Sequence, residues 1–376
     1  MLKGKERVVI TASLQLVLGM FFFMSTYFSY LFIFYTYFCL LYRNGLKRCA
    51  ICSSFYYCNK TCQSIDWKSH HKYDECKYYS VAFANNILQY MTTMDRFLLR
   101  LYLKLTIVDP GLYDRQLPIF NGSSRSFHSL MDHREDIEND ENRVDHIQHI
   151  LTIFNSLGLP NIDPDKIISL YGKIITNGFE LGSECNNIAS GFYIESAVFD
   201  HSCSPNAAIV FNSKKSHRCQ VRAIKNISEN EEIFISYINL RMIKEDRLKI
   251  LKSNYYFDCH CEKCESNNSD VNDSMIMKIN ESMAKYDSLK DGDPNEVNIL
   301  MSVDSLLEQV YQGYHPDYTM HIMRLIKAIK CSNIAFKGMK RNGNYKEIWN
   351  KMIQHVTITH GVDHTFYVDF LEQICN

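Results

Sequence analysis

The sequence carries almost no net charge. Its 376 residues include 41 lysines and arginines against 42 aspartates and glutamates, so the formal net charge at pH 7 is −1. No global electrostatic field therefore draws the chain toward nucleic acid. The cysteine-rich stretch 49–76 is balanced as well, with three lysines against three acidic residues. Because phosphate binding needs an excess of positive charge, direct DNA binding is not expected.

Charge is also missing locally, because residues 8–42 contain no charged side chain. About twenty apolar residues cross a bilayer as a helix, so this stretch is long enough to do so. It is too long for a simple signal peptide and has no clear cleavage site. Basic residues flank it on both sides, which leaves its orientation open. Three interpretations fit: a membrane anchor, a mispredicted first exon joined to the protein, or a buried pair of helices.

The 14 cysteines fall mainly into local clusters. The spacing Cys259-x-Cys261-x2-Cys264 is too tight for a disulfide framework and is typical of a structural zinc site that takes a fourth thiolate from elsewhere in the chain. Clustered spacings of this kind favour metal binding in a reducing compartment. The four isolated cysteines are interpreted as small buried apolar residues: Cys185, Cys219, Cys331 and Cys375.

A second cluster, in residues 49–76, has the spacing of a zinc module. It reads Cys49-x2-Cys52-x5-Cys58-x3-Cys62-x7-His70-x5-Cys76. A piece this short cannot bury enough apolar surface to fold unaided, so bound metal supplies the folding free energy.

The order of motifs in the second half of the chain resembles one arrangement. DHSCSPN (200–206) comes first, then the apolar run EEIFISY ending at Tyr237, then YYFDCHCEKC (255–264). This order resembles the core of a SET-domain lysine methyltransferase. The string YYCNKTCQSIDWKSHHKYDEC (56–76) resembles the second half of a MYND finger. Together they resemble the SET and MYND domain (SMYD) family.

The resemblance implies an α+β fold: a SET-domain β-fold with an inserted MYND zinc finger, a post-SET zinc site and a C-terminal helical, TPR-like domain. The expected segments are an atypical apolar N-terminus (1–48), a partial MYND-type finger (49–76), a helical insert (77–170), the SET core (171–250), the post-SET zinc motif (251–266) and the helical domain (267–376).

The resemblance also implies the roles of individual residues. Tyr237 is the expected catalytic tyrosine. The residues expected to contact the cofactor S-adenosyl-L-methionine are Asn177, Asp200, His201, Tyr237, Tyr255 and Phe257. Asp200 departs from the asparagine usual in the family, which replaces an amide donor by a carboxylate. Cys203, Cys259, Cys261 and Cys264 are the expected post-SET zinc ligands.

The MYND family interleaves two zinc sites. Here Cys49, Cys52, His70 and Cys76 are expected to form one, and Cys58 and Cys62 only half of the other. The first pair of that second site is absent, and only Cys39 lies upstream. In the family the last histidine and the last cysteine are spaced H-x3-C, whereas here five residues separate His70 from Cys76, so His71 is the alternative ligand. His70 is preferred because the seven residues between Cys62 and His70 keep the C-x7-H spacing of the family.

The implied function is S-adenosylmethionine-dependent methylation of lysine on histone or other protein tails, with a role in transcription regulation. The finger is expected to bind proline-containing peptides, and the compartments are nucleus and cytoplasm, or a membrane if residues 8–42 are genuine. Nothing before Cys49 resembles the glycine-rich opening of the SET fold, so weak or no methyl transfer is expected of this chain. The alternative is a catalytically weak or inactive scaffold that binds protein partners.

Periodicity predicts the remaining elements. Helices are expected within 79–108, 146–170, 241–251, 275–289, 296–312, 317–338, 344–358 and 364–374, and strands at 207–211, 220–223 and 233–237. Residues 265–274 are expected to be a polar linker. The acidic stretch 121–145 is interpreted as a solvated loop or helix face, or as an acidic rim that attracts basic substrate tails.

Overall fold

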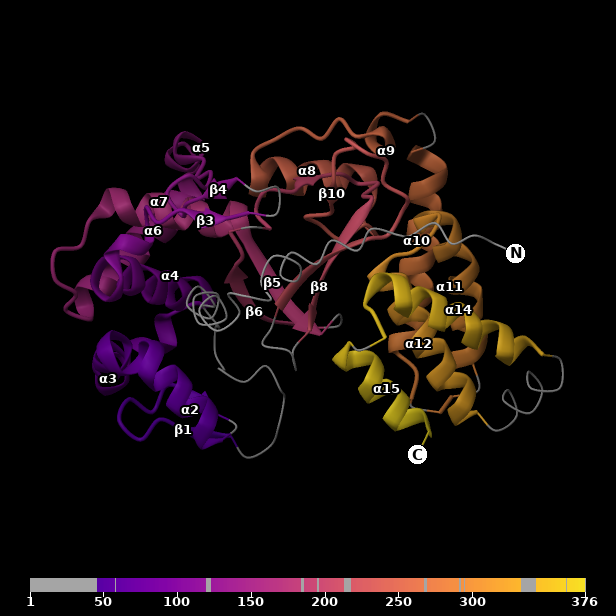
Figure 1. Cartoon of the computed structure of the whole chain (residues 1–376), viewed down its shortest axis with the longest axis horizontal. Coiled ribbons are helices and arrows are strands. Elements are labelled where there is room, and N and C mark those ends of the chain that lie inside the picture. The colour runs from indigo at the N-terminus through magenta and orange to yellow at the C-terminus, as the bar shows by residue number, and fades with distance from the viewer. Residues whose placement is uncertain are drawn as a thin grey trace. The chain divides into compact units, whose positions relative to one another are not determined.

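The computed structural model of the chain describes residues 46–57, 59–119, 123–183, 186–194, 196–212, 218–266, 269–290, 292–293, 295–332, 343–362 and 364–375. These residues form two compact units, which are treated separately: 46–198 with 254–256, and 199–253 with 257–375. Helices and short antiparallel or parallel strand pairs make up both units, which confirms the α+β class (Figure 1).

The uncharged stretch 8–42 lies outside the described residues. Among the residues that are described, no helix combines the length and the apolar character that crossing a membrane requires.

The first unit begins with the cysteine-rich finger, drawn in indigo in Figure 1. Its elements are β1 (Lys47–Arg48), β2 (Tyr56–Tyr57), α2 (Lys60–Asp66), a π-helical segment (Trp67–Glu75) and α3 (Cys76–Ala84). The Asn59 side chain accepts a hydrogen bond from the Cys62 N–H (2.9 Å) and so caps α2. From Lys60 to Ala84 the helical segments follow one another without a break.

The body of the first unit is mainly helical. Its elements are a 3₁₀ turn (Ile87–Tyr90), α4 (Thr93–Leu103), a π turn (Lys104–Val108), a 3₁₀ turn (Pro110–Leu112), β3 (Leu117–Pro118), β4 (Ser124–Arg125), α5 (Arg134–Glu138), α6 (Glu141–Ser156), α7 (Pro164–Asn177), β5 (Gly178–Ser183) and β6 (Asn186–Phe192). A reciprocal capping box of Thr92 and Asp95 starts α4. Part of the acidic stretch is therefore helical, as α5 and the start of α6.

Apolar side chains of α4 lie at the centre of this unit. Leu98, Leu99 and Leu101 are fully buried, with Phe127 and Phe154 in the same core. β5 and β6 pair antiparallel with Gly178 opposite Phe192, and β5 continues directly from α7.

The second unit contains the DHSCSPN motif (200–206), which begins in the first of the following strands. These strands are β7 (Asp200–His201), β8 (Ala207–Asn212), β9 (Arg218–Ala223) and β10 (Phe234–Ile235). β8 and β9 form an antiparallel hairpin, and β7 pairs parallel to β10 with His201 opposite Ile235. Strands thus form at the three predicted places, although β10 is shorter than the predicted run.

The helices of this unit are α8 (Lys244–Tyr255), α9 (Glu262–Glu265), α10 (Ser269–Asp287), α11 (Glu296–Tyr311), α12 (Pro316–Cys331), α14 (Asn344–Thr359) and α15 (Thr365–Cys375). From α10 to α14 each described helix packs against the next, as in stacked helix pairs (Figure 1).

The predicted polar linker 265–274 is wrong in its second half, because α10 already begins at Ser269. Asp273 explains the difference: its carboxylate accepts from the Lys244 N–H at 3.0 and 3.1 Å and so caps α8. A polar residue that caps a neighbouring helix reads as linker in the sequence alone.

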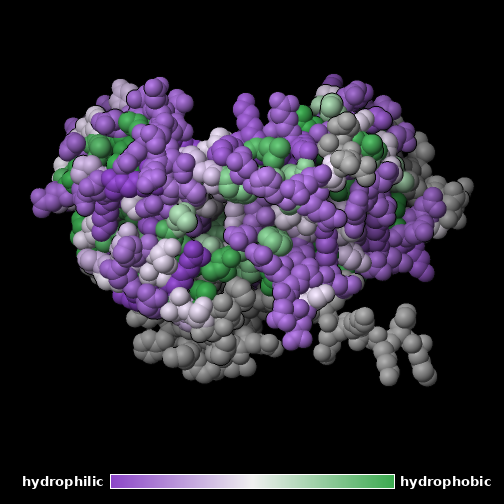
Figure 2. All heavy atoms as spheres, turned by 90° about the horizontal axis from the view of Figure 1, so that it is seen from above, coloured by the Kyte–Doolittle hydropathy of each residue, from purple (hydrophilic) through white to green (hydrophobic). Residues whose placement is uncertain are grey.

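Hydrophilic side chains predominate on the face shown in Figure 2, and hydrophobic ones gather only in small groups. The exposed large apolar residues are accordingly scattered over several elements, among them Ile51 and Ile65 of the finger. Small scattered groups of this kind are normal for a protein surface.

Buried histidines make the C-terminal helices sensitive to acid. Burial lowers the pKa of His321 and of His355 to about 4, whereas the pKa of a histidine in an unfolded chain is about 6.5. Both are therefore neutral when folded, and their contribution to stability is complete above about pH 6.5 and is lost as the pH falls toward 4. We expect the free energy of unfolding to fall by roughly 2 kcal/mol per histidine between pH 7 and pH 5.

Denaturant unfolding at the two pH values measures this loss. A His355→Phe variant keeps the ring contacts with Tyr314 (4.9 Å) and Tyr318 (4.8 Å) but binds no proton. Its loss of stability should be smaller than that of the wild type by about one histidine's share. An equal loss in both proteins would contradict the assignment.

Candidate functional site

Two sets of metal-ligating side chains converge in the described part of the chain. One consists of Cys49, Cys52, His71 and Cys76, and the other of Cys203, Cys259, Cys261 and Cys264. In each set the four donor atoms all lie within 4.8 Å of one another. Each set lies within one unit.

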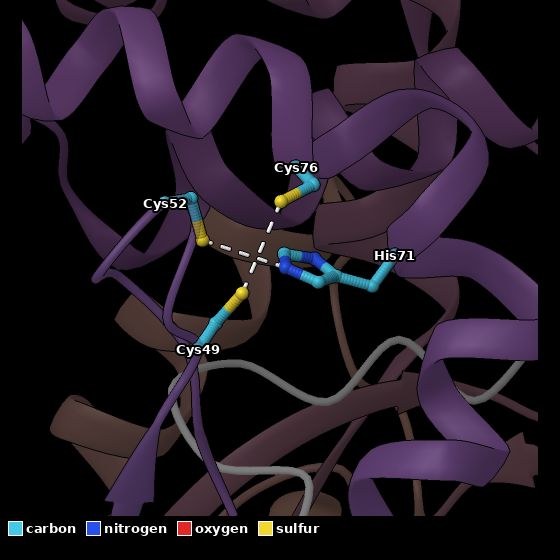
Figure 3. Close-up of side chains that lie close together, drawn as sticks. All are labelled: Cys49, Cys52, His71 and Cys76. Atoms are coloured by element: carbon cyan, nitrogen blue, oxygen red, sulfur yellow. Dashed lines mark hydrogen bonds between the residues drawn. The ribbon is translucent and has the colours of Figure 1, made fainter.

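The finger set comes from two segments (Figure 3). Cys49 and Cys52 belong to the turn before β2, where the Cys49 N–H donates to the Phe55 carbonyl (2.7 Å). His71 and Cys76 project from the helical run that follows α2. The Sγ atoms of Cys49 and Cys76 lie 3.9 Å apart, and Cys52 Sγ lies 3.4 Å from His71 Nε2.

These distances fit a tetrahedral zinc ion. With Zn–S bonds of about 2.3 Å and Zn–N bonds of about 2.0–2.1 Å, tetrahedral geometry separates two sulfurs by about 3.8 Å and a sulfur from a nitrogen by about 3.5 Å. Three thiolates and an imidazole are a common structural zinc set.

The thiols of the finger set differ in their pKa, since burial and the neighbouring Cys52 and Cys49 raise the pKa of Cys76 to about 12, whereas that of Cys49 is lowered. Burial opposes the thiolate, but backbone N–H groups of Cys52 and Ile51, together with His71, lower the pKa of Cys49 to about 7. Burial likewise opposes a charged imidazole, but contacts with Cys52 and Glu75 raise the pKa of His71 to about 10. To bind zinc through Nε2, the imidazole of His71 would have to be neutral.

The structure brings His71, rather than the predicted ligand His70, together with the three cysteines. The reason is the π-helical geometry of Trp67–Glu75, in which the Cys76 N–H bonds the carbonyl of His71, five residues earlier. In a π turn residues five apart lie one above the other, so His71 and Cys76 face the same side. This wider turn accommodates the longer spacing between the histidine and Cys76. His70 is also buried but does not belong to the converging set.

Two histidine variants should separate the candidates. We expect His71→Asn to lower the zinc content by one ion per chain and His70→Asn to leave it unchanged, because only the first removes a converging donor. Elemental analysis of the purified proteins measures this. The wild type should hold two zinc ions per chain; the loss of zinc in the His70 variant alone would reverse the assignment.

The expected second half-site of the finger gains no further support. Cys62 lies on α2 with intermediate exposure and belongs to neither converging set, while Cys58 and Cys39 lie outside the described residues.

The structure brings together the four sulfurs of the post-SET set, which come from two segments 56 or more positions apart in the sequence (203 against 259–264). Cys203 and Cys264 have Sγ atoms 3.6 Å apart, close to the tetrahedral separation. Asn206 anchors the Cys203 loop, because its side chain accepts from the Phe234 N–H (2.8 Å) and donates to the Glu232 carbonyl (2.8 Å). The backbone N–H of Cys264 bonds the Cys261 carbonyl (2.8 Å). This set also fits a structural zinc ion.

Aromatic rings gather beside this zinc set. The rings of His201 and Tyr237 have centroids 5.3 Å apart, and those of His201 and Phe257 lie 6.0 Å apart. His201 Nδ1 accepts a hydrogen bond from the Tyr237 N–H (3.0 Å), and its Nε2 lies 3.3 Å from Cys203 Sγ. Burial lowers the pKa of His201 to about 4, so its ring is neutral at pH 7. The Tyr237 hydroxyl donates to the Phe199 carbonyl at 2.6 Å.

The other predicted cofactor residues lie as follows. Asp200 is exposed at the start of β7. Asn177 ends α7 in the first unit, and its Nδ2 donates to the Met131 carbonyl (2.7 Å) and the Lys173 carbonyl (3.1 Å). Tyr255 is the half-buried last residue of α8.

Sequence reasoning missed Tyr256, which adopts a left-handed conformation (φ 61°) directly after α8. A tyrosine in this backbone conformation is strained. The centroid of the Tyr256 ring lies 5.1 Å from the centroid of the His133 ring. No sequence pattern marks such a position.

Comparison with known proteins agrees with these features. A family model described as SET domain matches residues 57–238, and one described as MYND finger matches residues 37–76. Histone-lysine N-methyltransferase ASHR1 of Arabidopsis thaliana is 31% identical over 240 residues, 62% of this chain and 48% of that protein. N-lysine methyltransferase SMYD2 of Homo sapiens is 28% identical over 247 residues, with 65% and 53% covered.

Histone-lysine N-methyltransferase SMYD3 of Mus musculus is 27% identical over 258 residues, 67% of this chain and 58% of that protein. The chain thus spans about half the length of the curated relatives it matches. With a SET match and a MYND match in one polypeptide, and with the cysteine sets of both modules brought together, the chain carries the two domains that define the SET and MYND domain (SMYD) family.

Proposed function

We propose that this chain is an S-adenosylmethionine-dependent protein-lysine N-methyltransferase. When bound, S-adenosylmethionine supplies an electrophilic methyl group on a sulfonium ion. The work left to the protein is to align a lysine amine, to exclude water and to favour the neutral amine by desolvation. The SET match and the relatives' names support this function.

The observation that carries the proposal is the double fixation of Tyr237. Its backbone N–H is bound by the His201 ring and its hydroxyl by the Phe199 carbonyl, so both ends of the residue are held. We infer that Tyr237 presents its oxygen to the reacting centre, where it and the Phe199 carbonyl stabilise positive charge.

The rings of His201, Tyr237 and Phe257 fit a cationic ligand. Aromatic faces attract the sulfonium of the cofactor and the lysine ammonium alike, and a neutral His201 adds no repulsion. Phe257 precedes the ligand Cys259 by two residues. We propose that the post-SET zinc holds this ring in place, so that metal binding and cofactor binding are linked.

The remaining contacts are proposed on the resemblance. Because Nδ2 of Asn177 already donates within its own unit, its Oδ1 is the atom proposed to accept from the amino group of the cofactor. Asp200 is proposed to accept a second such bond, and Tyr255 to contribute to the aromatic lid.

The substrates are proposed to be lysine-bearing tails of histones or other proteins, in nucleus and cytoplasm. The finger is proposed to bind proline-containing peptides. Ile51 and Ile65, which are more than half exposed on the finger, provide apolar contact area for such a peptide.

A second candidate function is a binding scaffold without turnover. Asp200 favours it, since a carboxylate replaces the usual amide donor at an exposed position beside His201. An acidic group attracts the cationic cofactor but donates no hydrogen bond to its carboxylate.

Tritiated S-adenosylmethionine with histones and cell extract distinguishes the two functions. Methyl incorporation into lysine by the wild type supports the enzyme, and the incorporation should then increase in Asp200→Asn. Cofactor binding by calorimetry without incorporation in either protein supports the scaffold. The absence of both binding and incorporation would remove the proposed cofactor site.

A further inference from the structure

Behind the zinc ligands of the finger lies a buried cluster of charged side chains. Asp66, Glu75 and Arg100 are 0%, 2% and 5% exposed. Arg100 Nη2 donates to Glu75 Oε2 (2.6 Å) and to Asp66 Oδ1 (3.0 Å), and its Nε donates to Glu75 Oε1. The buried Tyr57 hydroxyl donates to Asp66 Oδ2 (2.7 Å). Charges buried this deeply are tolerated only when they are paired and hydrogen-bonded.

The cluster touches the metal site through His71. While Nε2 of His71 faces Cys52, its Nδ1 lies 3.5 Å from Glu75 Oε2. An imidazole that binds metal through one nitrogen donates from the other, and a carboxylate partner sets the tautomer and the ring orientation. Glu75 Oε2 lies within ion-pair distance of this nitrogen, which forms no hydrogen bond with the described residues, and Glu75 is therefore the carboxylate placed to accept from it.

The arginine of the cluster comes from outside the finger. Arg100 lies on α4, where its neighbours Leu98, Leu99 and Leu101 are fully buried core residues. Its guanidinium lies 5.4 Å from the centre of the Phe55 ring, and that ring lies 4.4 Å from His71. Arg100 therefore contacts the surroundings of the ligand by two routes, one ionic and one aromatic.

We propose that Glu75 and Arg100 are positioning residues that join the finger's zinc site to α4, so that zinc binding and the packing of α4 form one cooperative unit. On this basis the finger is not an autonomous module attached to the body. Loss of the ion frees His71 and Glu75, which withdraws a partner from Arg100 in the core. Loss of Arg100 in turn leaves two carboxylates behind the ligands without their cation.

Zinc release to a chromogenic chelator tests the first half of the proposal. In Arg100→Met and Glu75→Gln we expect one of the two zinc ions to leave about 10- to 100-fold faster than in the wild type, with the other unchanged. Arg100→Lys, which keeps the charge but cannot pair with both carboxylates in the same geometry, should give an intermediate rate. Arg115→Met, which breaks the half-exposed pair with Asp109 (2.9 Å), is the matched control.

Cobalt substitution gives a readout that stability alone does not move. The visible spectrum of cobalt in the finger should change in Glu75→Gln, because the imidazole is held less firmly in a Cys3His set. Wild-type release rates together with a wild-type spectrum in both Arg100→Met and Glu75→Gln would overturn the positioning role.

Hydrogen exchange tests the coupling to α4. Amides of residues 93–103 should exchange at least tenfold faster in His71→Asn than in His70→Asn, while those of α14 in the other unit serve as an internal reference. Equal exchange of α4 in the two variants would overturn the coupling, even if the release rates changed as expected. This comparison does not depend on methyl transfer, so its result is separate from that of the proposed function.

Discussion

Replacing Tyr237 by phenylalanine is expected to lower kcat for methyl transfer to a lysine peptide by about 100-fold. The substitution removes the hydroxyl that bonds the Phe199 carbonyl at 2.6 Å, while the backbone bond to His201 persists. Affinity for S-adenosylmethionine should therefore change little. Steady-state kinetics with calorimetry on the same samples separates the two quantities.

Tyr314→Phe is the matched control, because it removes a hydroxyl from a half-buried tyrosine in the same unit but outside the aromatic group. It should leave kcat unchanged. Turnover of Tyr237→Phe within about twofold of wild type would exclude the tyrosine from the chemical step.

Removing one thiolate from the post-SET set is expected to have the largest effect on stability. In Cys261→Ser the zinc content should fall by one ion, because three remaining sulfurs hold the ion much less tightly. Structural zinc contributes about 10 kcal/mol or more of binding free energy in small domains. If even about 3 kcal/mol of that is lost, the midpoint of thermal unfolding falls by about 10 °C.

Cys219→Ser controls for the loss of a thiol as such. Cys219 is also buried, on β9, and belongs to neither donor set. The Cys219→Ser variant should keep both zinc ions and lose about 1 kcal/mol of its free energy of unfolding. Calorimetric scans and elemental analysis compare the two variants; a retained second zinc in Cys261→Ser would contradict the four-cysteine site. Methyl transfer should also fall in Cys261→Ser, since Phe257 loses its anchor.

Elements whose signal is local are the ones that sequence predicts well. The helices of the C-terminal domain follow from apolar periodicity, and the strands β8 and β9 from runs rich in apolar residues bounded by turns. α12, predicted to residue 338, is described only to Cys331. The post-SET trio is equally local, because Cys259, Cys261 and Cys264 lie within six residues.

The choice between His70 and His71 could not come from spacing. It depends on the phase of the helix, and a π turn between His71 and Cys76 shifts that phase by one residue. In the same turn, the buried Glu75 accepts a hydrogen bond from Arg100 of the body.

Composition, spacing and motif order thus indicated the SET and MYND domains, the fold class and most of the side chains that converge in the two donor sets, because these depend on residues near one another in the chain or on a recognisable order. Tertiary structure alone decided which histidine faces the metal, that Phe199 holds the Tyr237 hydroxyl, and that Arg100 stands behind the finger. Glu75 and Arg100 are 25 residues apart, and only folding brings such partners within hydrogen-bonding distance. Their identity therefore follows from packing rather than from any pattern along the chain.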